Sequence, residues 1–128
     1  MNPVLSTALS GLQAATNRVA VSANNIANAL TSRPTTPGAP TPKGVFKAQE
    51  VTQRSVGGGG VATDVWDKNP ATVTGADSSS PTGLSAFPNV DFVEEVVNQA
   101  VAVASYRANA AVIRTQQKLD DALLDIKT

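Results

Sequence analysis

The prolines and glycines of this 128-residue chain are concentrated in its middle, and this distribution restricts the fold more than any other feature. Residues 32–90 hold every proline except Pro3 and every glycine except Gly11. Proline removes a backbone donor and glycine costs conformational entropy in a helix, so long helices are disfavoured in this stretch. The sequence therefore predicts its long helices on either side, over residues 3–31 and 91–126.

The N-terminal segment carries an apolar stripe with heptad-like spacing, interrupted at Thr16. Its members are Leu5, Leu9, Leu12, Val19, Ala23, Ile26 and Leu30. Asn2 is a favoured N-cap residue, and Pro3 suits the first helical position. The other face is polar but almost uncharged, which favours packing against further helices. A weakly polar exposed face is the simpler alternative.

The C-terminal segment predicts a second, longer helix. Asp91 is placed to cap it, and Glu94 stands at the position that completes a capping box. Over its first half the apolar residues cover a wide surface, which indicates burial on more than one side. At about 1.5 Å per residue, this helix approaches ~50 Å in length, more than the diameter of a small globule.

The middle predicts one small hairpin between extended segments. Two runs rich in β-branched and aromatic residues, 45–56 and 61–66, flank the glycines at 57–60. Residues 33–44 and 77–85 are rich in proline, serine, threonine and glycine, which is typical of linkers.

These patterns predict a mainly α fold. In it, two long terminal helices pack as an antiparallel coiled-coil-like pair, and the Pro/Gly-rich middle contains a small β-hairpin at about 45–66. The expected division is residues 1–31 as an N-terminal axial helix, 32–90 as the middle and 91–128 as a C-terminal axial helix, all within one structural unit.

Composition argues against most catalytic and ligand-binding chemistry. The chain has no histidine and no cysteine, which removes the commonest general base, the thiol nucleophile and most zinc-site chemistry. The adjacent pairs Glu94–Glu95 and Asp120–Asp121 point about 100° apart on a helix, which does not suit a shared substrate atom. The glycines at 57–60 are not followed by the lysine of a phosphate loop. We predict no enzyme activity, no cofactor and no metal.

Charge and hydropathy restrict the partners. The 10 basic residues balance the 10 acidic ones, so net charge provides no attraction to nucleic acid or to an anionic membrane. The longest strictly apolar run, residues 100–104, is far below the roughly 20 residues of a membrane-spanning helix. The first residues also lack the basic and apolar regions of a cleaved signal peptide. We expect no nucleic-acid partner and no direct membrane insertion.

Some polar residues on the predicted helices are expected to contact other parts of the chain or another chain. Asn24, Asn25 and Asn28 lower intrinsic helicity, so we expect them to hydrogen-bond the backbone of a partner chain or of the second helix. Simple fraying of the helix end is the alternative. Tyr106 and Arg107 suit either an interface or internal packing, because both residue types are common in binding hot spots.

Both ends of the chain resemble one family. Residues 8–15, ALSGLQAA, and 22–29, SANNIANA, resemble the N-terminal signature of bacterial flagellar axial proteins of the rod and hook group. Residues 87–98, FPNVDFVEEVVN, and 105–109, SYRAN, resemble the matching C-terminal signature, most closely that of short proximal rod proteins.

The resemblance implies a structural subunit of the flagellar basal-body rod, which assembles through its terminal helices into a torque-transmitting helical tube. The implied partners are copies of itself, other rod and hook basal-body proteins and the flagellar type III export apparatus. The implied location is the periplasm-spanning rod, reached without a cleaved signal. The alternative is a soluble binding module or export adaptor that docks on axial proteins. The expected subunit-interface residues are Leu5, Leu9, Leu12, Val19, Asn24, Asn25, Ile26, Asn28, Val93, Val97, Tyr106, Arg107 and Asn109.

Overall fold

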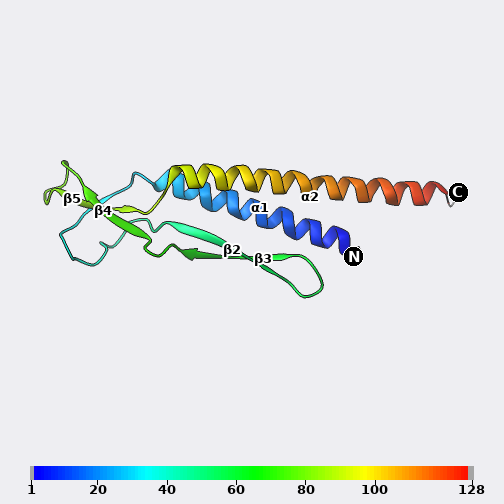
Figure 1. The fold of residues 1–128 in the computed structure, drawn as a ribbon, viewed down its shortest axis with the longest axis horizontal. Coiled ribbons are helices and arrows are strands. Elements are labelled where there is room, and N and C mark those ends of the chain that lie inside the picture. The colour runs from blue at the N-terminus through cyan, green and yellow to red at the C-terminus, as the bar shows by residue number, and fades with distance from the viewer. Residues whose placement is uncertain (1, 127–128) are drawn as a thin grey trace.

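The computed structural model describes residues 2–126, so the last two residues of the expected C-terminal segment lie outside it. Helix α1 spans Pro3–Asn28 and helix α2 spans Phe92–Ile126. The two helices run side by side in opposite directions, and α2 continues past the N-terminal end of α1 (Figure 1). This places both chain ends at the same end of an elongated molecule.

Both helices begin at side-chain caps. The Asn2 Oδ1 atom accepts a hydrogen bond from the Val4 amide at 3.0 Å, with Pro3 in the first turn. The Asp91 Oδ1 atom accepts from the Val93 amide at 2.8 Å and from the Glu94 amide at 3.2 Å. Both predicted caps are confirmed, because each carboxyl or amide oxygen satisfies donors that have no partner within the helix.

Strands β2, Gln49–Ser55, and β3, Val61–Asp67, form an antiparallel hairpin. At its tip the Val56 amide donates to the Gly60 carbonyl at 3.2 Å. Gly58, Gly59 and Gly60 all have positive φ angles, between 92° and 102°, a conformation that side chains strongly disfavour. The glycine run therefore closes the hairpin.

A second sheet corrects the predicted fold class. It contains β1, Arg33–Pro34, β4, Thr72–Ala76, and β5, Leu84–Pro88, in the order β1–β5–β4, all antiparallel. The chain is 49% helix and 21% strand, in two sheets. The prediction of a mainly α fold with only a small hairpin is wrong.

The error arose because small residues occupy neighbouring buried positions in the central strand of the second sheet. Ser85 and Ala86 in the central strand are buried although neither is strongly apolar. The polar run before them, expected to be a linker, is the turn between β4 and β5. There the Ser79 hydroxyl and amide both donate to Asp77 Oδ1, and the Asp77 amide donates to the Gly83 carbonyl at 3.0 Å. Such side-chain hydrogen bonds are typical of tight turns.

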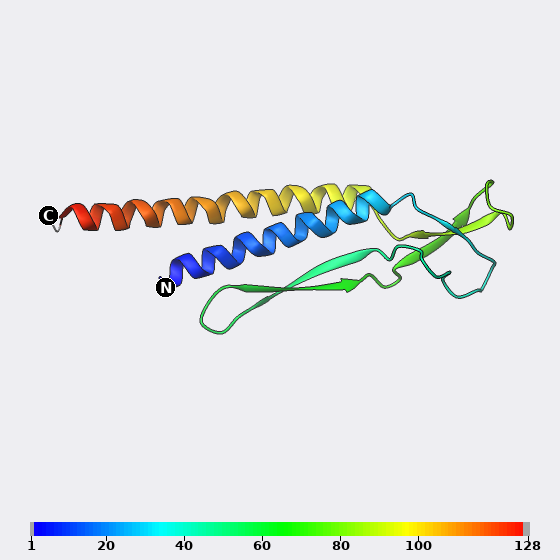
Figure 2. The same ribbon diagram turned by 180° about the vertical axis from the view of Figure 1, so that it is seen from behind.

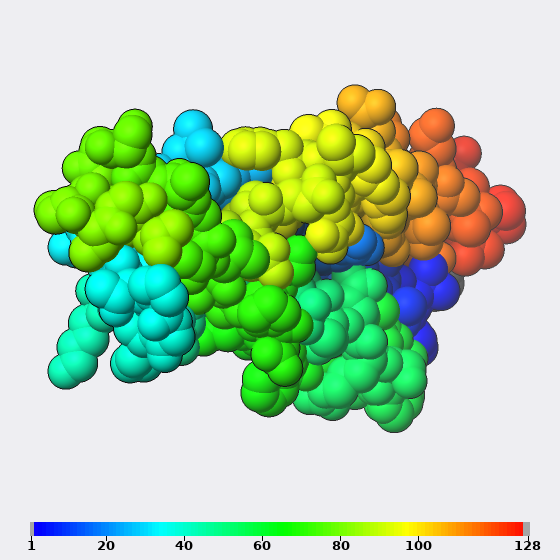
Figure 3. All heavy atoms as spheres, turned by 60° about the vertical axis from the view of Figure 1, so that its left-hand side comes forward, coloured from blue at the N-terminus to red at the C-terminus, as the bar shows by residue number. Residues whose placement is uncertain are grey.

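Helix α1 lies between α2 and the β2–β3 hairpin, and the second sheet lies at the far end of the molecule (Figure 2). The buried apolar core consists of alanines: Ala8, Ala14, Ala15, Ala29, Ala48, Ala86 and Ala102. Alanine contributes little apolar area, so the core is thin. In a space-filling view, part of α1 is visible between the hairpin and α2 (Figure 3).

The buried line of α1 is not the large apolar stripe seen in the sequence. Ala8, Ala15, Ser22 and Ala29 are buried, whereas Leu9 is 55% exposed. Leu5, Leu12, Val19 and Ile26 are half-buried, and Leu30 is exposed. Small side chains let the two helix backbones approach closely, so the larger residues lie beside the contact.

Candidate assembly surfaces

Among the described residues, the largest fully buried side chain is that of Asn25, which joins three elements. Its Nδ2 atom donates to the Gln49 carbonyl at 2.7 Å, and its Oδ1 atom accepts from the Gln49 amide at 2.9 Å. The same Nδ2 donates to Glu95 Oε1 at 2.7 Å. Asn25 is 1% exposed, so one amide group holds α1, the outer edge of β2 and α2 together in a dry site.

Glu95 and Ser22 complete this junction. Glu95 is 3% exposed, and its backbone carbonyl accepts from the Ser22 hydroxyl at 2.9 Å. Buried polar groups are costly unless they are hydrogen-bonded, so a fully bonded cluster favours one arrangement of the three elements over others. We call Ser22, Asn25, Gln49 and Glu95 the polar junction.

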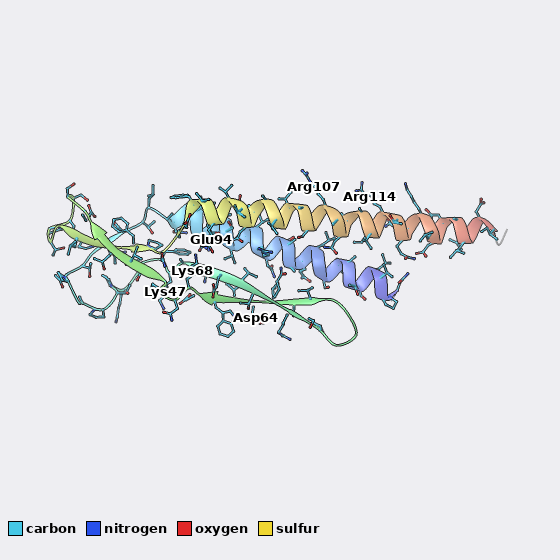
Figure 4. All side chains as sticks on the ribbon, viewed as in Figure 1. Lys47, Asp64, Lys68, Glu94, Arg107 and Arg114 are labelled. Atoms are coloured by element: carbon cyan, nitrogen blue, oxygen red, sulfur yellow. The ribbon has the colours of Figure 1, made fainter. Side chains whose placement is uncertain are left out.

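Charged residues surround the polar junction. The Lys68 ammonium contacts Glu94 Oε2 at 2.8 Å and links the segment after β3 to the first turn of α2 (Figure 4). The Arg18 Nη2 atom donates to Asn98 Oδ1 at 3.2 Å. Within residues 2–126 no hydrogen bond joins the Glu94 carboxylate to the Asp91 amide, so the expected capping box is not completed; Glu94 pairs with Lys68 instead. A cleft of about 160 Å³ lies among these residues, lined by both positive and negative groups.

The hairpin also contacts α1 along its length. The Ser10 hydroxyl accepts from the Val61 amide at 3.0 Å, and the Asn17 Nδ2 atom donates to the Thr63 hydroxyl at 2.7 Å. The uncharged polar face of α1, expected to pack on further helices, is thus partly covered by the chain's own hairpin.

The two helices also approach each other closely at Gly11 and Asn109, at some distance along the pair from the polar junction. A Cβ atom at Gly11 would lie 2.6 Å from the Asn109 amide atoms and 2.7 Å from Asn109 Cγ. Asn109 in turn donates to the Ser105 carbonyl at 2.9 Å. Any side chain at position 11 therefore forces the Asn109 side chain to move.

The predicted interface residues occupy three different environments. Asn25 and Asn109 lie in contacts within the chain. The Asn28 Nδ2 atom donates to the Asn24 carbonyl at 2.9 Å and to Asn24 Oδ1 at 3.1 Å, both within α1. The half-buried members, besides Asn28 and Asn109, are Leu5, Leu12, Val19 and Ile26, and the exposed ones are Leu9, Asn24, Val93, Val97, Tyr106 and Arg107.

The partners of Asn25 differ from those expected. The sequence analysis suggested the backbone of the second helix or of another chain, whereas Asn25 bonds the backbone of β2 and the side chain of Glu95. Gln49, Glu95 and Ser22 were missed as members of one cluster. The only signal for Glu95 was its place in an adjacent acidic pair, which suggested capping and solvation.

The exposed side of α2 is apolar. Val93 is 73% exposed and Val97 55%, and Phe92, Val96, Val101, Val103, Tyr106 and Val112 are exposed as well. Large amounts of exposed apolar surface usually mark contacts with other proteins. This arrangement supports docking of helices from other chains.

No metal-binding group of acidic residues occurs within residues 2–126. Neither helix, over its described length, is apolar enough to cross a membrane. At the polar junction, Lys68 pairs with Glu94 and Arg18 donates to Asn98, and both contacts join elements of the fold.

Comparison with known families gives two matches in chain order. Residues 5–35 match the family model described as flagella basal body rod protein. Residues 83–126 match the one described as flagellar basal body rod FlgEFG protein C-terminal. No curated protein matches the chain. The two matched segments include nearly all of α1 and α2, and they contain Asn25 and Glu95, while β2, β3 and β4 lie between them.

Proposed function

This chain belongs to the flagellar basal-body rod protein family, and we propose that it is a rod subunit that assembles through its terminal helices into a helical tube. The family is structural, with a general role in the rod of the basal body. We further propose that the tube transmits torque along the packed helices.

The observation that carries this proposal is the exposed apolar surface on the matched helices. Val93, Val97 and Tyr106 of α2, with Leu9 of α1, remain between 47% and 73% exposed within the described chain. Removing apolar area from water is favourable by about 25 cal/mol per Å², before the entropic cost of association is subtracted. We propose that these residues, with Arg107, contact neighbouring subunits, whereas Asn25 and Asn109 act inside each subunit.

The proposed partners are copies of this chain and other rod and hook basal-body proteins. Contacts between unlike surfaces generate open helical assemblies, and the two helices present unlike surfaces. We also propose export through the flagellar type III apparatus to the periplasm. The absence of cysteine supports such a route, because no disulfide can form in an oxidising compartment.

A matched pair of substitutions tests this function. Val97→Asp places a carboxylate on the exposed face of α2, so the fold of the single chain is retained while a dry contact between subunits is lost. Gln53→Asp, on the exposed hairpin strand, is the control. The readout is the amount of chain in isolated basal bodies, together with swimming motility.

We expect Val97→Asp to abolish incorporation and motility, and Gln53→Asp to leave both close to wild type. Absence of the wild-type chain from basal bodies, or normal incorporation of Val97→Asp, contradicts the proposal.

A further inference from the structure

The β2–β3 hairpin is a two-stranded sheet, so each of its strands has one edge without a neighbouring strand. Within the hairpin region the Val56 amide donates to the Gly60 carbonyl, and the Lys68 amide donates to the Ala48 carbonyl. Backbone direction alternates along a strand, so even-numbered residues direct their amides and carbonyls toward the other strand. Odd-numbered residues direct theirs outward, where a further strand can bind.

Helix α1 covers the first part of each edge. At the start of β2 the Asn25 side chain binds both the carbonyl and the amide of Gln49, as a neighbouring strand would. At the start of β3 the Ser10 hydroxyl accepts from the Val61 amide. Both edges are therefore protected where they begin.

The remainder of each edge is open. Within the described chain, no hydrogen bond from outside the hairpin reaches the outward backbone groups of residues 51–55 or 63–67. The residues that carry these groups are Val51, Gln53 and Ser55 in β2 and Thr63, Val65 and Asp67 in β3. We call residues 51–55 the β2 half-edge and residues 63–67 the β3 half-edge. Open strand edges readily accept a further strand.

The two half-edges match in length and direction. They contain equal numbers of residues, they lie on opposite edges of the hairpin, and β2 and β3 are antiparallel. When two copies point the same way, the β2 half-edge of one therefore meets the β3 half-edge of the other in antiparallel orientation. Full overlap of the half-edges places Gln53 opposite Val65 of the second copy. The odd-numbered residues then form hydrogen-bonded pairs, with about six backbone hydrogen bonds in all.

The same register brings opposite charges together. Arg54 stands opposite Asp64 of the second copy, in a pair without backbone hydrogen bonds, where facing side chains are closest. Within one copy the Arg54 Nε atom contacts Asp64 Oδ2 at 3.1 Å, and both side chains are partly exposed. A guanidinium has five donors and a carboxylate has two oxygens, so each group can bind a second partner as well. Charge complementarity therefore favours another copy of this chain as the added strand.

We infer that the β2 half-edge of one copy pairs with the β3 half-edge of a neighbouring copy, with Gln53 opposite Val65 and Arg54 opposite Asp64. This inference rests on the proposed self-assembly and gives the hairpin a contact that the terminal helices do not supply. Each copy offers one half-edge of each kind, so the pairing can continue from copy to copy. Because it uses backbone groups, the pairing tolerates a polar side chain at position 53, as in the Gln53→Asp control.

Disulfide formation between two singly substituted chains tests the contact, because the natural chain has no cysteine. One full chain carries Gln53→Cys and the other Val65→Cys, and flagellated cells produce both together. Isolated basal bodies are then oxidised mildly. A hydrogen-bonded antiparallel pair holds its Cα atoms about 5.5 Å apart, within the range of a disulfide. Cells that produce either variant alone are the matched controls, and one cysteine per chain excludes a bond within the chain.

We expect disulfide-linked dimers from the mixture to be at least tenfold more abundant than from either variant alone. Incorporated chains that give no dimers overturn the inference and leave the proposed function intact. Dimers that form equally well from Gln53→Cys alone also overturn it, because they indicate that two β2 strands pair with each other. Absence of the wild-type chain from basal bodies contradicts the proposed function instead. Where the variants fail to incorporate, oxidation of the concentrated purified mixture is judged by the same outcomes.

Charge reversal supplies a second measurement. Adding Arg54→Glu to the Gln53→Cys chain sets two carboxylates opposite each other between the copies, and we expect the dimers to fall at least threefold. Adding Asp64→Arg to the Val65→Cys chain restores opposite charges between the copies but leaves like charges within each chain. Recovery of the dimers therefore reports on the contact between copies. Dimers that Arg54→Glu does not reduce, or that Asp64→Arg does not recover, contradict the assigned register.

Discussion

Replacing Asn25 with alanine tests the role of the polar junction in holding the hairpin on the helices. The substitution removes both hydrogen bonds to the Gln49 backbone and the one to Glu95. Each buried group left without a partner costs about 1–3 kcal/mol, and the losses at one site are not fully additive. We expect the free energy of unfolding to fall by about 3–5 kcal/mol.

The assay is urea denaturation of the purified chain, followed by far-ultraviolet circular dichroism for the helices and by Trp66 fluorescence for the hairpin. Trp66 lies in β3 and reports on the hairpin alone. Asn28→Ala is the matched control, because the hydrogen bonds of the Asn28 side chain go to Asn24 within α1 and their loss costs under about 1 kcal/mol. A loss below about 1 kcal/mol for Asn25→Ala, or equal losses for both variants, refutes the role assigned to the junction.

Two further predictions concern single contacts. Gly11→Ala forces the Asn109 side chain to move, and we expect a loss of about 1–3 kcal/mol in urea denaturation, partly recovered by adding Asn109→Ala; no loss contradicts the close contact. The Ser79 hydroxyl and amide lower the pKa of Asp77 below its ordinary value of 3.8, so the ionised carboxylate is favoured in the folded chain. Its stabilising effect is present above pH ~3.8 and is lost as the pH falls through the folded-state pKa. An NMR titration of the Asp77 carboxyl carbon checks the direction, and Ser79→Ala is expected to raise the pKa.

Local signals in the sequence were sufficient to predict the two helices and the β2–β3 hairpin. Asn2 and Asp91 are cap residues at sites where the helical pattern begins, and each side chain accepts a hydrogen bond from an amide of the first turn. The glycine run between two β-rich segments placed the hairpin turn. Each of these features depends on residues close together in the chain, which is why sequence patterns reveal them.

The second sheet and the polar junction depend on contacts between distant segments. Strand β5 is buried with serine and alanine, so it shows no apolar alternation that would distinguish it from a linker. The Asn25 contacts join residues 24 and 70 positions apart, and a carboxylate in an acidic pair gives no sign that it is buried. The buried side of α1 was missed for a related reason, because close helix packing selects small residues while pattern analysis follows large ones.

A cryo-electron microscopy map of isolated basal bodies tests the central claim most directly. The account predicts density for this chain in the rod, with α1 and α2 of neighbouring copies in contact through the exposed face that contains Val93 and Val97. A rod in which this chain is absent, or in which copies meet only through the hairpin and the second sheet, contradicts assembly through the terminal helices.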